Sequence, residues 1–309
     1  MVIILCRYIF MKINIKHIGS FAQQVLERSE RALVSGIASR GIYIQPKSDW
    51  TLYISQENFR GPLTLNLEQG SFRLKKVRAG HLAQFSPGEI HFPEEDITVS
   101  LTDGNIWDAP GVDKENGAAT INVDPILSLV HKITPENPYL PLLSRNPEQI
   151  PGVAVIGERI LDLQNALVAG IPEKITEGSI KLLGLGPGLT PLGDDFLLGV
   201  ILTLNRWKHV LPDQFRRGPV NLVTDIVDSL NEIILENTRL KTTRISASLL
   251  ACAMERAADE RLLVVLDGLF SDSPITQSDM RNLLRWGNSS GITALAGMIS
   301  VLRTKDTLS

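Results

Sequence analysis

Residues 183–198 read L-G-L-G-P-G-L-T-P-L-G-D-D-F-L-L. Four glycines lie within ten positions, two prolines stiffen the path, and Asp194 and Asp195 close the glycine-rich part. Apolar residues with helical spacing follow the two acids directly. Glycine permits a positive φ, and proline fixes φ and removes an N–H donor. The stretch therefore predicts a rigid loop that opens a helix, an arrangement that can present backbone N–H groups to an anion.

This loop differs from the standard phosphate-binding loops. Gly188 and Gly193 have the spacing of the first half of a P-loop, but Asp194 and Asp195 stand where Lys and Ser or Thr are required. Leu189 occupies the place of the third glycine of the dinucleotide fingerprint. A phosphate bound here would need a divalent cation, or an arginine from elsewhere, to offset the acids. The structural alternative is that one of the acids caps the helix and complements its dipole. One acid is enough for a cap, so the pair together with the glycines favours a site.

The composition is that of an ordinary globular chain. Its 309 residues are 43% hydrophobic and 21% charged, which leaves room for a large core or two domains. A net charge of −3 argues against a nucleic-acid surface, and no stretch approaches a transmembrane span. Cys6 and Cys252 have no metal-ligand spacing and give no basis for a disulfide framework. We expect a cytoplasmic protein without nucleic-acid or membrane partners.

The patterns predict an α+β fold whose N-terminal half is β-rich, either a small antiparallel sheet or a barrel, packed on a mostly α-helical C-terminal half. The predicted boundaries are a β-rich domain over 11–110, a proline-rich crossover over 111–151 and a helical domain over 152–309. Residues 1–10 are apolar but lack the features of a signal peptide. They are either a buried strand or a mis-assigned extension before Met11, and we favour the extension.

Within the β-rich half, the spacing over 20–37 is loosely helical. Short, often alternating runs separated by turn residues then predict strands. They cover 42–44, 50–55, 63–67, 72–77, 82–85, 89–92, 97–102 and 106–107. In the second half, helical spacing predicts helices over 126–131, 220–234, 246–258 and 292–302, and Thr276 with Asp279 predicts the start of a further helix that ends near Trp286.

Three polar clusters each precede a helical pattern: the glycine-rich loop, residues 242–246 (T-T-R-I-S) and residues 287–291 (G-N-S-S-G). If they converge, their helix N-termini and Arg244 would form an anion pocket, because the guanidinium suits carboxylate and phosphate. The predicted catalytic residues are Asp194, Asp195 and Arg244, and the acid pair is a candidate Mg²⁺ site. The predicted substrate-binding residues are Gly186, Gly188, Thr190, Gly193, Thr243, Ser246, Asn288, Ser289, Ser290 and Gly291. The structural alternatives are ordinary N-capping for the serines and a surface ion pair for Arg244.

Residues 287–291 also match the G-x-S-x-G nucleophile elbow. That motif needs a preceding strand, whereas 281–286 reads as helix, and its histidine should follow the serine, whereas the last histidine is His209. A hydrolase triad is therefore disfavoured. The clusters suit electrostatic and positioning catalysis on an anionic substrate.

Together, G-L-G-P-G-L-T-P-L-G-D-D-F-L-L-G, T-T-R-I-S and G-N-S-S-G resemble the AllH-like family, long known only as a conserved domain of unknown function. The resemblance spans most of the chain and includes residues 17–22. The family's usual form has Ser where Leu192 stands and commonly His where Asn288 stands.

The resemblance implies one subunit of a multi-subunit oxamate carbamoyltransferase of anaerobic allantoin breakdown, which interconverts oxalurate and phosphate with oxamate and carbamoyl phosphate. All these substrates are small anions, several of them bearing phosphate or carboxylate, which agrees with the three polar clusters. The departures at Leu192 and Asn288 also suit a paralogue with a related substrate. Two alternatives remain open: a non-catalytic partner subunit whose loop is only a helix junction, and a kinase-like enzyme that uses Asp194 and Asp195 for Mg²⁺.

Overall fold

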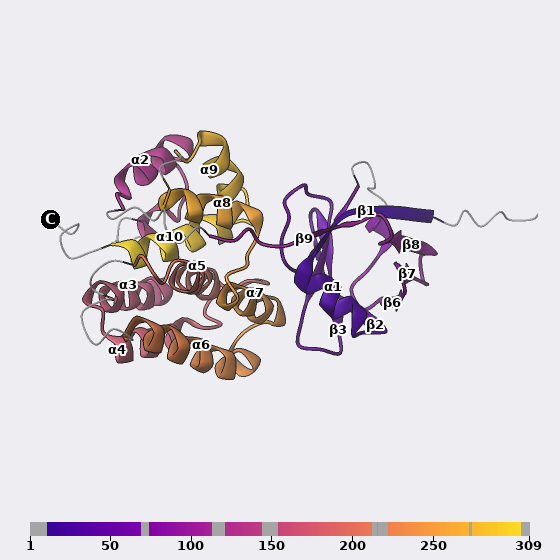
Figure 1. The fold of residues 1–309 in the computed structure, drawn as a ribbon, viewed down its shortest axis with the longest axis horizontal. Coiled ribbons are helices and arrows are strands. Elements are labelled where there is room, and N and C mark those ends of the chain that lie inside the picture. The colour runs from indigo at the N-terminus through magenta and orange to yellow at the C-terminus, as the bar shows by residue number, and fades with distance from the viewer. Residues whose placement is uncertain are drawn as a thin grey trace, which may run out of the picture. The chain divides into compact units, whose positions relative to one another are not determined.

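A computed structural model describes residues 11–68, 74–112, 121–143, 154–211, 215, 222–271 and 274–303. The chain divides into two compact units, Met1–Asp108 and Ala109–Ser309, which we treat separately (Figure 1). The predicted alternatives for residues 1–10 lie outside the described residues.

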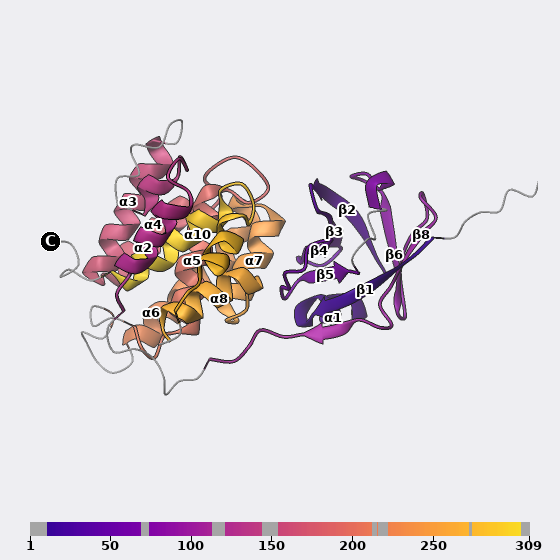
Figure 2. The same cartoon turned by 90° about the horizontal axis from the view of Figure 1, so that it is seen from above.

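Unit 1 is a small β-barrel. Its strands are β1 (Met11–Gly19), β2 (Arg31–Ala38), β3 (Gly41–Pro46), β4 (Leu52–Ser55), β5 (Thr64–Leu67), β6 (Leu82–Ser86), β7 (Glu89–Phe92), β8 (Ile97–Ser100) and β9 (Asn105–Trp107). Their order is β5-β4-β3-β2-β6-β7-β8-β1-β9, and a pairing of β5 with β1 closes the ring (Figure 2). The pairings β1–β8, β1–β9 and β4–β5 are parallel, so the sheet is mixed. The predicted barrel alternative is confirmed.

Alternation with period two decides which side chains enter the barrel. Ile15, Ile44, Ile54, Leu65 and Val99 are buried there. Because every second residue of a strand faces inward, the side chains between them face outward. The closed ring also leaves few unpaired sheet edges.

The helix predicted over 20–37 is only partly correct. Helix α1 (Ser20–Glu27) ends early, and β2 follows it. Residues of β2 alternate between exposed and buried because Ala32, Val34 and Gly36 face inward. Of the charges in this segment, Glu27 ends α1, Arg28 and Glu30 lie in the following turn, and Arg31 begins β2.

The strand predicted over 72–77 is also wrong where the structure describes it. Residues Leu74–Lys76 form a short 3₁₀ helix, η1. Leu74 is the only buried residue of η1, so these residues form a turn and do not pair with a strand of the sheet. Residues 69–73 lie outside the described part.

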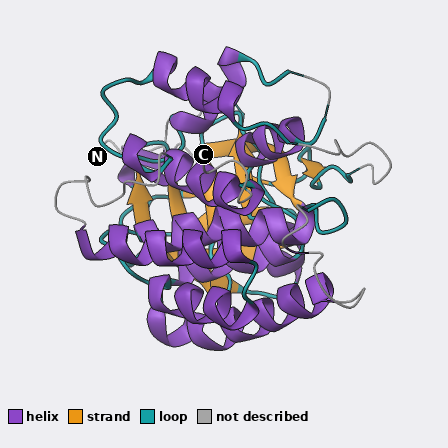
Figure 3. Cartoon of the chain, turned by 90° about the vertical axis from the view of Figure 1, so that its left-hand side faces the viewer, coloured by secondary structure: helices purple, strands orange, loops and turns teal. Residues whose placement is uncertain are grey.

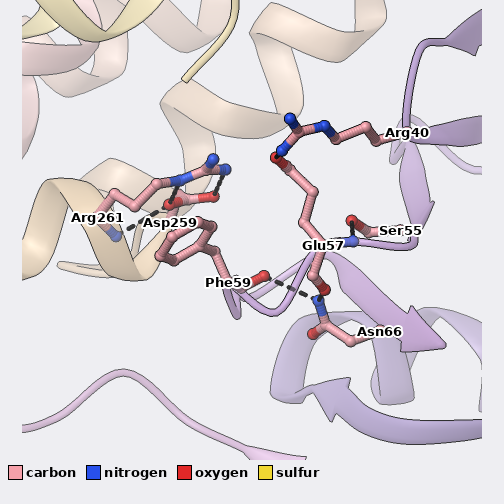
Figure 4. Close-up of polar contacts among 7 residues, drawn as sticks. All are labelled: Arg40, Ser55, Glu57, Phe59, Asn66, Asp259 and Arg261. Atoms are coloured by element: carbon pink, nitrogen blue, oxygen red, sulfur yellow. Dashed lines mark hydrogen bonds and ion pairs between the residues drawn. The ribbon is translucent and has the colours of Figure 1, made fainter. Parts of the chain in front are cut away.

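The loop between β4 and β5 is held by polar contacts (Figure 4). The Asn66 side-chain amide donates to the carbonyl of Glu57 at 2.9 Å and to that of Phe59 at 2.8 Å. Ser55 Oγ accepts the Glu57 N–H at 3.0 Å, and Arg40 pairs with the Glu57 carboxylate at 3.1 Å. These contacts satisfy loop carbonyls that no strand pairs.

Unit 2 is built almost wholly from helices (Figure 3). They are α2 (Asp124–Ile133), η2 (Leu140–Leu142), α3 (Ala154–Ala169), α4 (Pro172–Leu182), α5 (Leu192–Arg206), α6 (Leu222–Lys241), α7 (Arg244–Met254), α8 (Glu260–Leu269), α9 (Gln277–Leu284) and α10 (Ser290–Leu302). The predicted α+β class is confirmed. Thr276 and Asp279 form the predicted capping box at the start of α9.

Helices α5 and α10 form the centre of unit 2, and every residue of both is buried. A Cβ at Gly199 of α5 would lie 1.9 Å from the carbonyl oxygen of Ala294, and one at Gly297 of α10 would lie 2.1 Å from that of Phe196. The two backbones therefore touch through paired glycines. No larger residue fits without moving the helices apart.

The C-terminal end of α5 carries an ion pair in which the buried Arg206 donates from all three guanidinium nitrogens. The Arg206 guanidinium donates twice to the Asp267 carboxylate, at 2.7 Å each, and also to the carbonyls of Arg256 and Pro110. Trp207 Nε1 donates to the same carboxylate at 3.0 Å. Such a pair holds its geometry because each buried donor has an acceptor.

The close approach of α5 and α10 predicts that Gly199→Ala will destabilise unit 2. We expect a loss of about 3 kcal/mol in the free energy of unfolding, because the added methyl group meets a carbonyl oxygen. Urea denaturation followed by helical circular dichroism measures it. Gly111→Ala is the matched control, since a Cβ there meets nothing within 4 Å. A change within about 0.5 kcal/mol at both positions would contradict the packing argument.

Candidate functional site

The glycine-rich loop joins α4 to α5, and its glycines have different reasons to be glycine. Gly184, Gly186 and Gly188 all have positive φ, at 77°, 122° and 102°. A Cβ at Gly184 would lie 1.6 Å from the carbonyl oxygen of Lys241, and one at Gly193 would lie 2.1 Å from that of Leu182. At Gly188 a Cβ would meet nothing within 4 Å. Close chain packing thus explains Gly184 and Gly193, while the backbone at Gly188 faces open space.

Asp194 ties the loop to the start of α7. Its Oδ1 accepts the N–H of Gly184 at 2.6 Å, and its Oδ2 accepts the hydroxyl of Thr242. The side chain is only 2% exposed, and burial raises its pKa, while the bonds from Thr242 and Gly184 and the nearby Ser246 hydroxyl lower it. Asp194 therefore acts first as a brace between two segments.

Asp195 faces the third polar cluster and is much less well bonded. Its Oδ2 accepts the Thr190 hydroxyl at 3.4 Å, and the Thr190 hydroxyl lies 3.3 Å from Ser290 Oγ. Burial raises the pKa of Asp195 to about 7, and the charge of Asp194 adds to the rise, while the hydroxyls of Ser290 and Thr190 oppose it. A carboxyl group that titrates near neutral pH in a polar cluster can exchange a proton with a ligand.

The capping alternatives predicted for the acids and the serines require side-chain capping bonds, which the structure does not show at α5 or α10. The N-cap of α5 is Pro191, and both acids lie in the first turn without a side-chain capping bond, although they still complement the dipole. At α7 the cap is Thr243, whose hydroxyl oxygen accepts the N–H of Ser246 at 3.1 Å. At α10 the N-cap residue is Ser289, and its side chain makes no capping bond. The predicted capping role of the serine side chains is therefore not seen at α7 or α10.

Thr243 has a second bond that holds the loop in place. Its hydroxyl donates to the carbonyl of Leu189 at 2.7 Å. Inside the loop, the N–H of Gly193 donates to the carbonyl of Leu185 at 2.9 Å. The exposed tip of the loop, residues 187–189, thus rests on a fixed base.

Ser246 is buried, with 2% exposure, and its hydroxyl has no hydrogen-bond partner. It nevertheless lies near enough to Asp194 to lower the pKa of that carboxyl group. A buried hydroxyl without a partner costs free energy, so its presence beside two acids needs a reason.

The structure brings most of the predicted residues together. Contacts join the loop and the two acids to the starts of α7 and α10 through Thr190, Thr243, Ser246 and Ser290. Gly291, buried next to them, is packed against α9, where its Cβ would lie 1.9 Å from the carbonyl oxygen of Leu283. Arg244 is exposed in the first turn of α7 and forms no ion pair with either acid, and Asn288 is exposed before α10.

Sequence reasoning missed Thr242 and the Gly184 N–H as members of the site. Thr242 belongs to the T-T-R-I-S cluster, and the only sequence signal was its position beside Thr243. Its role depends on the end of α6 meeting the glycine-rich loop. The Gly184 N–H carries no sequence signal, because only the loop conformation aims it at a carboxylate.

Other features of the described residues lie apart from this cluster. A pocket of about 420 Å³ is lined by Trp207, Phe270 and Ile275 among others, and one of about 440 Å³ lies between α3 and α4. Neither is lined by a residue of the three clusters. The described side chains contain no group of three or more His, Cys, Asp or Glu able to hold a metal ion. None of the described helices has the length and apolar character needed to cross a membrane.

The raised pKa of Asp195 predicts a pH-dependent effect of Asp195→Asn. Between the ordinary pKa of 3.8 and about 7, the folded chain binds more protons than the unfolded chain, so stability falls as pH rises through this range. Asparagine does not titrate. We expect the variant to melt about 5 °C above wild type at pH 8, with the gap narrowing toward pH 5. Parallel pH profiles in thermal melts would contradict this assignment.

Asp194→Asn is the matched comparison and should behave in the opposite way. An amide nitrogen placed against the Gly184 N–H or the Thr242 hydroxyl removes an acceptor that the buried donors need. We expect a loss of about 2 kcal/mol that becomes smaller as pH rises from 5 to 8, because the raised pKa of the Asp194 carboxyl group already lowers wild-type stability there, measured by urea denaturation. A variant as stable as wild type would show that Asp194 is not a brace.

Comparison with known proteins agrees with the sequence motifs. Neither the curated proteins nor the solved structures contain a match to this chain. The matching family model covers residues 182–302, less than half of the chain but all three polar clusters. Residues 182–302 match the model of the AllH family, described as oxamate carbamoyltransferase subunit AllH, and over these residues the resemblance of the sequence motifs to that family is confirmed.

Proposed function

We propose that this protein is a subunit of a carbamoyltransferase that acts on oxamate or oxalurate and carbamoyl phosphate in purine nitrogen catabolism. The observation that carries the proposal is the coincidence of the family match with the polar cluster. Residues 182–302 include the loop, Asp194, Asp195 and the starts of α7 and α10. The word subunit in the family description favours partner subunits and a multi-subunit assembly.

The chemistry of the cluster suits this reaction class. Carbamoyl transfer needs a positioned nitrogen nucleophile and a group that takes its proton. Asp195 has a pKa of about 7, so both of its protonation states are populated at neutral pH. The backbone at Gly188 leaves room for a ligand beside the exposed loop tip.

Arg244 is our candidate for the anionic end of the substrate. It stands in the first turn of α7, two residues before Ser246, and is exposed. A guanidinium can donate two parallel hydrogen bonds to a carboxylate or phosphate. Gly186, Gly188, Asn288 and Ser289 would line the same site, and Mg²⁺ is a candidate partner of the acids when phosphate binds.

Carbamoyl-transfer assays on the complex assembled with its partner subunits test the role of Asp195. We expect Asp195→Asn to lower kcat about 100-fold or more, because the variant cannot take up a proton. Asp162→Asn, a change at an exposed residue of α3, should retain wild-type turnover. Full activity of the Asp195→Asn complex would favour the alternative of a non-catalytic partner subunit.

The same assay tests Arg244. We expect Arg244→Ala to raise KM for the anionic substrate about tenfold with a smaller effect on kcat, because the guanidinium contributes binding in the ground state. Arg159→Ala, at the surface of α3, is the control for loss of one positive charge. Equal KM values in the two variants would remove Arg244 from the site.

A further inference from the structure

The two acids at the start of α5 differ in how much of their hydrogen-bonding capacity is used. A carboxylate has about four lone-pair sites, and a buried one is normally filled by several donors. Both carboxylate oxygens of Asp194 accept hydrogen bonds, from the Gly184 N–H and the Thr242 hydroxyl. Asp195 accepts the Thr190 hydroxyl at 3.4 Å on Oδ2, and apart from this hydroxyl and that of Ser290 no described residue stabilises its charge. Asp195 therefore has room for a donor from outside the chain.

No cation offsets these two acids within the described parts of the chain. Neither forms an ion pair with a lysine, arginine or histidine there, and their pKa values respond only to burial, to hydroxyl and N–H donors and, for Asp195, to Asp194. An anionic group placed against Asp195 would meet uncompensated negative charge. A neutral group with N–H donors would meet the Asp195 carboxylate, which still has room to accept a hydrogen bond.

Ser246 supplies a second observation, beside the neighbouring acid Asp194. Its hydroxyl is buried, unpartnered and close to Asp194, so it can still donate or accept a hydrogen bond. A primary amide carries both N–H donors and a carbonyl acceptor. The Asp195 carboxylate can accept a hydrogen bond from the N–H of such an amide, and the Ser246 hydroxyl can donate one to its carbonyl.

We propose that Asp195 accepts the N–H of an amide nitrogen of the substrate, so that the acidic end of the site selects an amide group over a carboxylate or phosphate. The inference rests on the proposed function for the reaction that follows. In that reaction the amide nitrogen forms a bond to the carbamoyl carbon while the bond from that carbon to the phosphate oxygen breaks. Phosphate leaves with the electron pair, and the proton of the nitrogen passes to the Asp195 carboxylate.

The test compares oxamate with oxalate, which carries a carboxylate oxygen in place of the amide nitrogen. Binding is measured by calorimetry at pH 8 with the full chain and with the assembled complex. We expect wild type to bind oxamate at least about tenfold more tightly than oxalate. Asp195→Asn should reduce this preference to about threefold or less, since the repulsion of oxalate and the charge on the acceptor are both lost.

Asp162→Asn is the matched control and should keep the full preference, because it removes one exposed carboxylate elsewhere on the same unit. Thermal melts at pH 8 confirm that the variants are folded.

The results separate this inference from the proposed function. Equal or tighter binding of oxalate by wild type, or a preference that survives in Asp195→Asn, overturns amide recognition even if carbamoyl transfer is observed. Preferred binding of oxamate without carbamoyl transfer by the complex supports amide recognition and overturns the proposed reaction. Failure of both ligands to bind the chain and the complex overturns both.

Discussion

Unit 2 depends on the direct backbone contact of α5 with α10. Gly199 and Gly297 let the two helices approach so closely that a carbonyl oxygen occupies the space of each missing side chain. Both helices are buried along their whole length, so their apolar residues face neighbours on every side. Most of the remaining helices of the unit pack on α5 or α10, and α2 packs on α9. The polar cluster forms where α5 and α10 begin.

The two ends of α5 show how the same helix serves stability and chemistry. At its C-terminal end, the buried charge of Arg206 is paired with Asp267 and supported by two carbonyls and the indole of Trp207. At its N-terminal end, Asp195 is buried with hydroxyl donors alone, from Thr190 and Ser290, and with no cation among the described residues. Folding alone favours the satisfied arrangement, since an under-bonded buried carboxylate costs free energy. The asymmetry is therefore a physical reason to place ligand chemistry at the N-terminal end.

The glycine-rich loop combines packing with access. Gly184 and Gly193 are required by neighbouring carbonyls, so much of the glycine content serves the junction of α4, α5 and α6. Asp194 completes that junction by joining the Gly184 N–H to the Thr242 hydroxyl. With the junction braced, the tip at Gly188 remains open and Asp195 points to the start of α10. The alternative of a purely structural helix junction thus describes Asp194 well and Asp195 poorly.

The sequence by itself determined the class of each unit. Period-two alternation marked most of the barrel strands, and helical spacing with the Thr276 capping signal marked several helices. The motif near Asp194 pointed to the family whose model matches residues 182–302, because all these signals are local. The helix predicted over 20–37 was wrong at β2, because helical and strand spacings overlap there within a few residues. Only the tertiary structure decided that β1 closes the barrel against β5, and that Asp194 and Asp195 have different surroundings. Two adjacent aspartates carry the same local signal in the sequence. Their burial and hydrogen-bond donors come from distant segments: Thr242, some fifty residues away, donates to Asp194, and Ser290, about one hundred residues away, donates to Asp195.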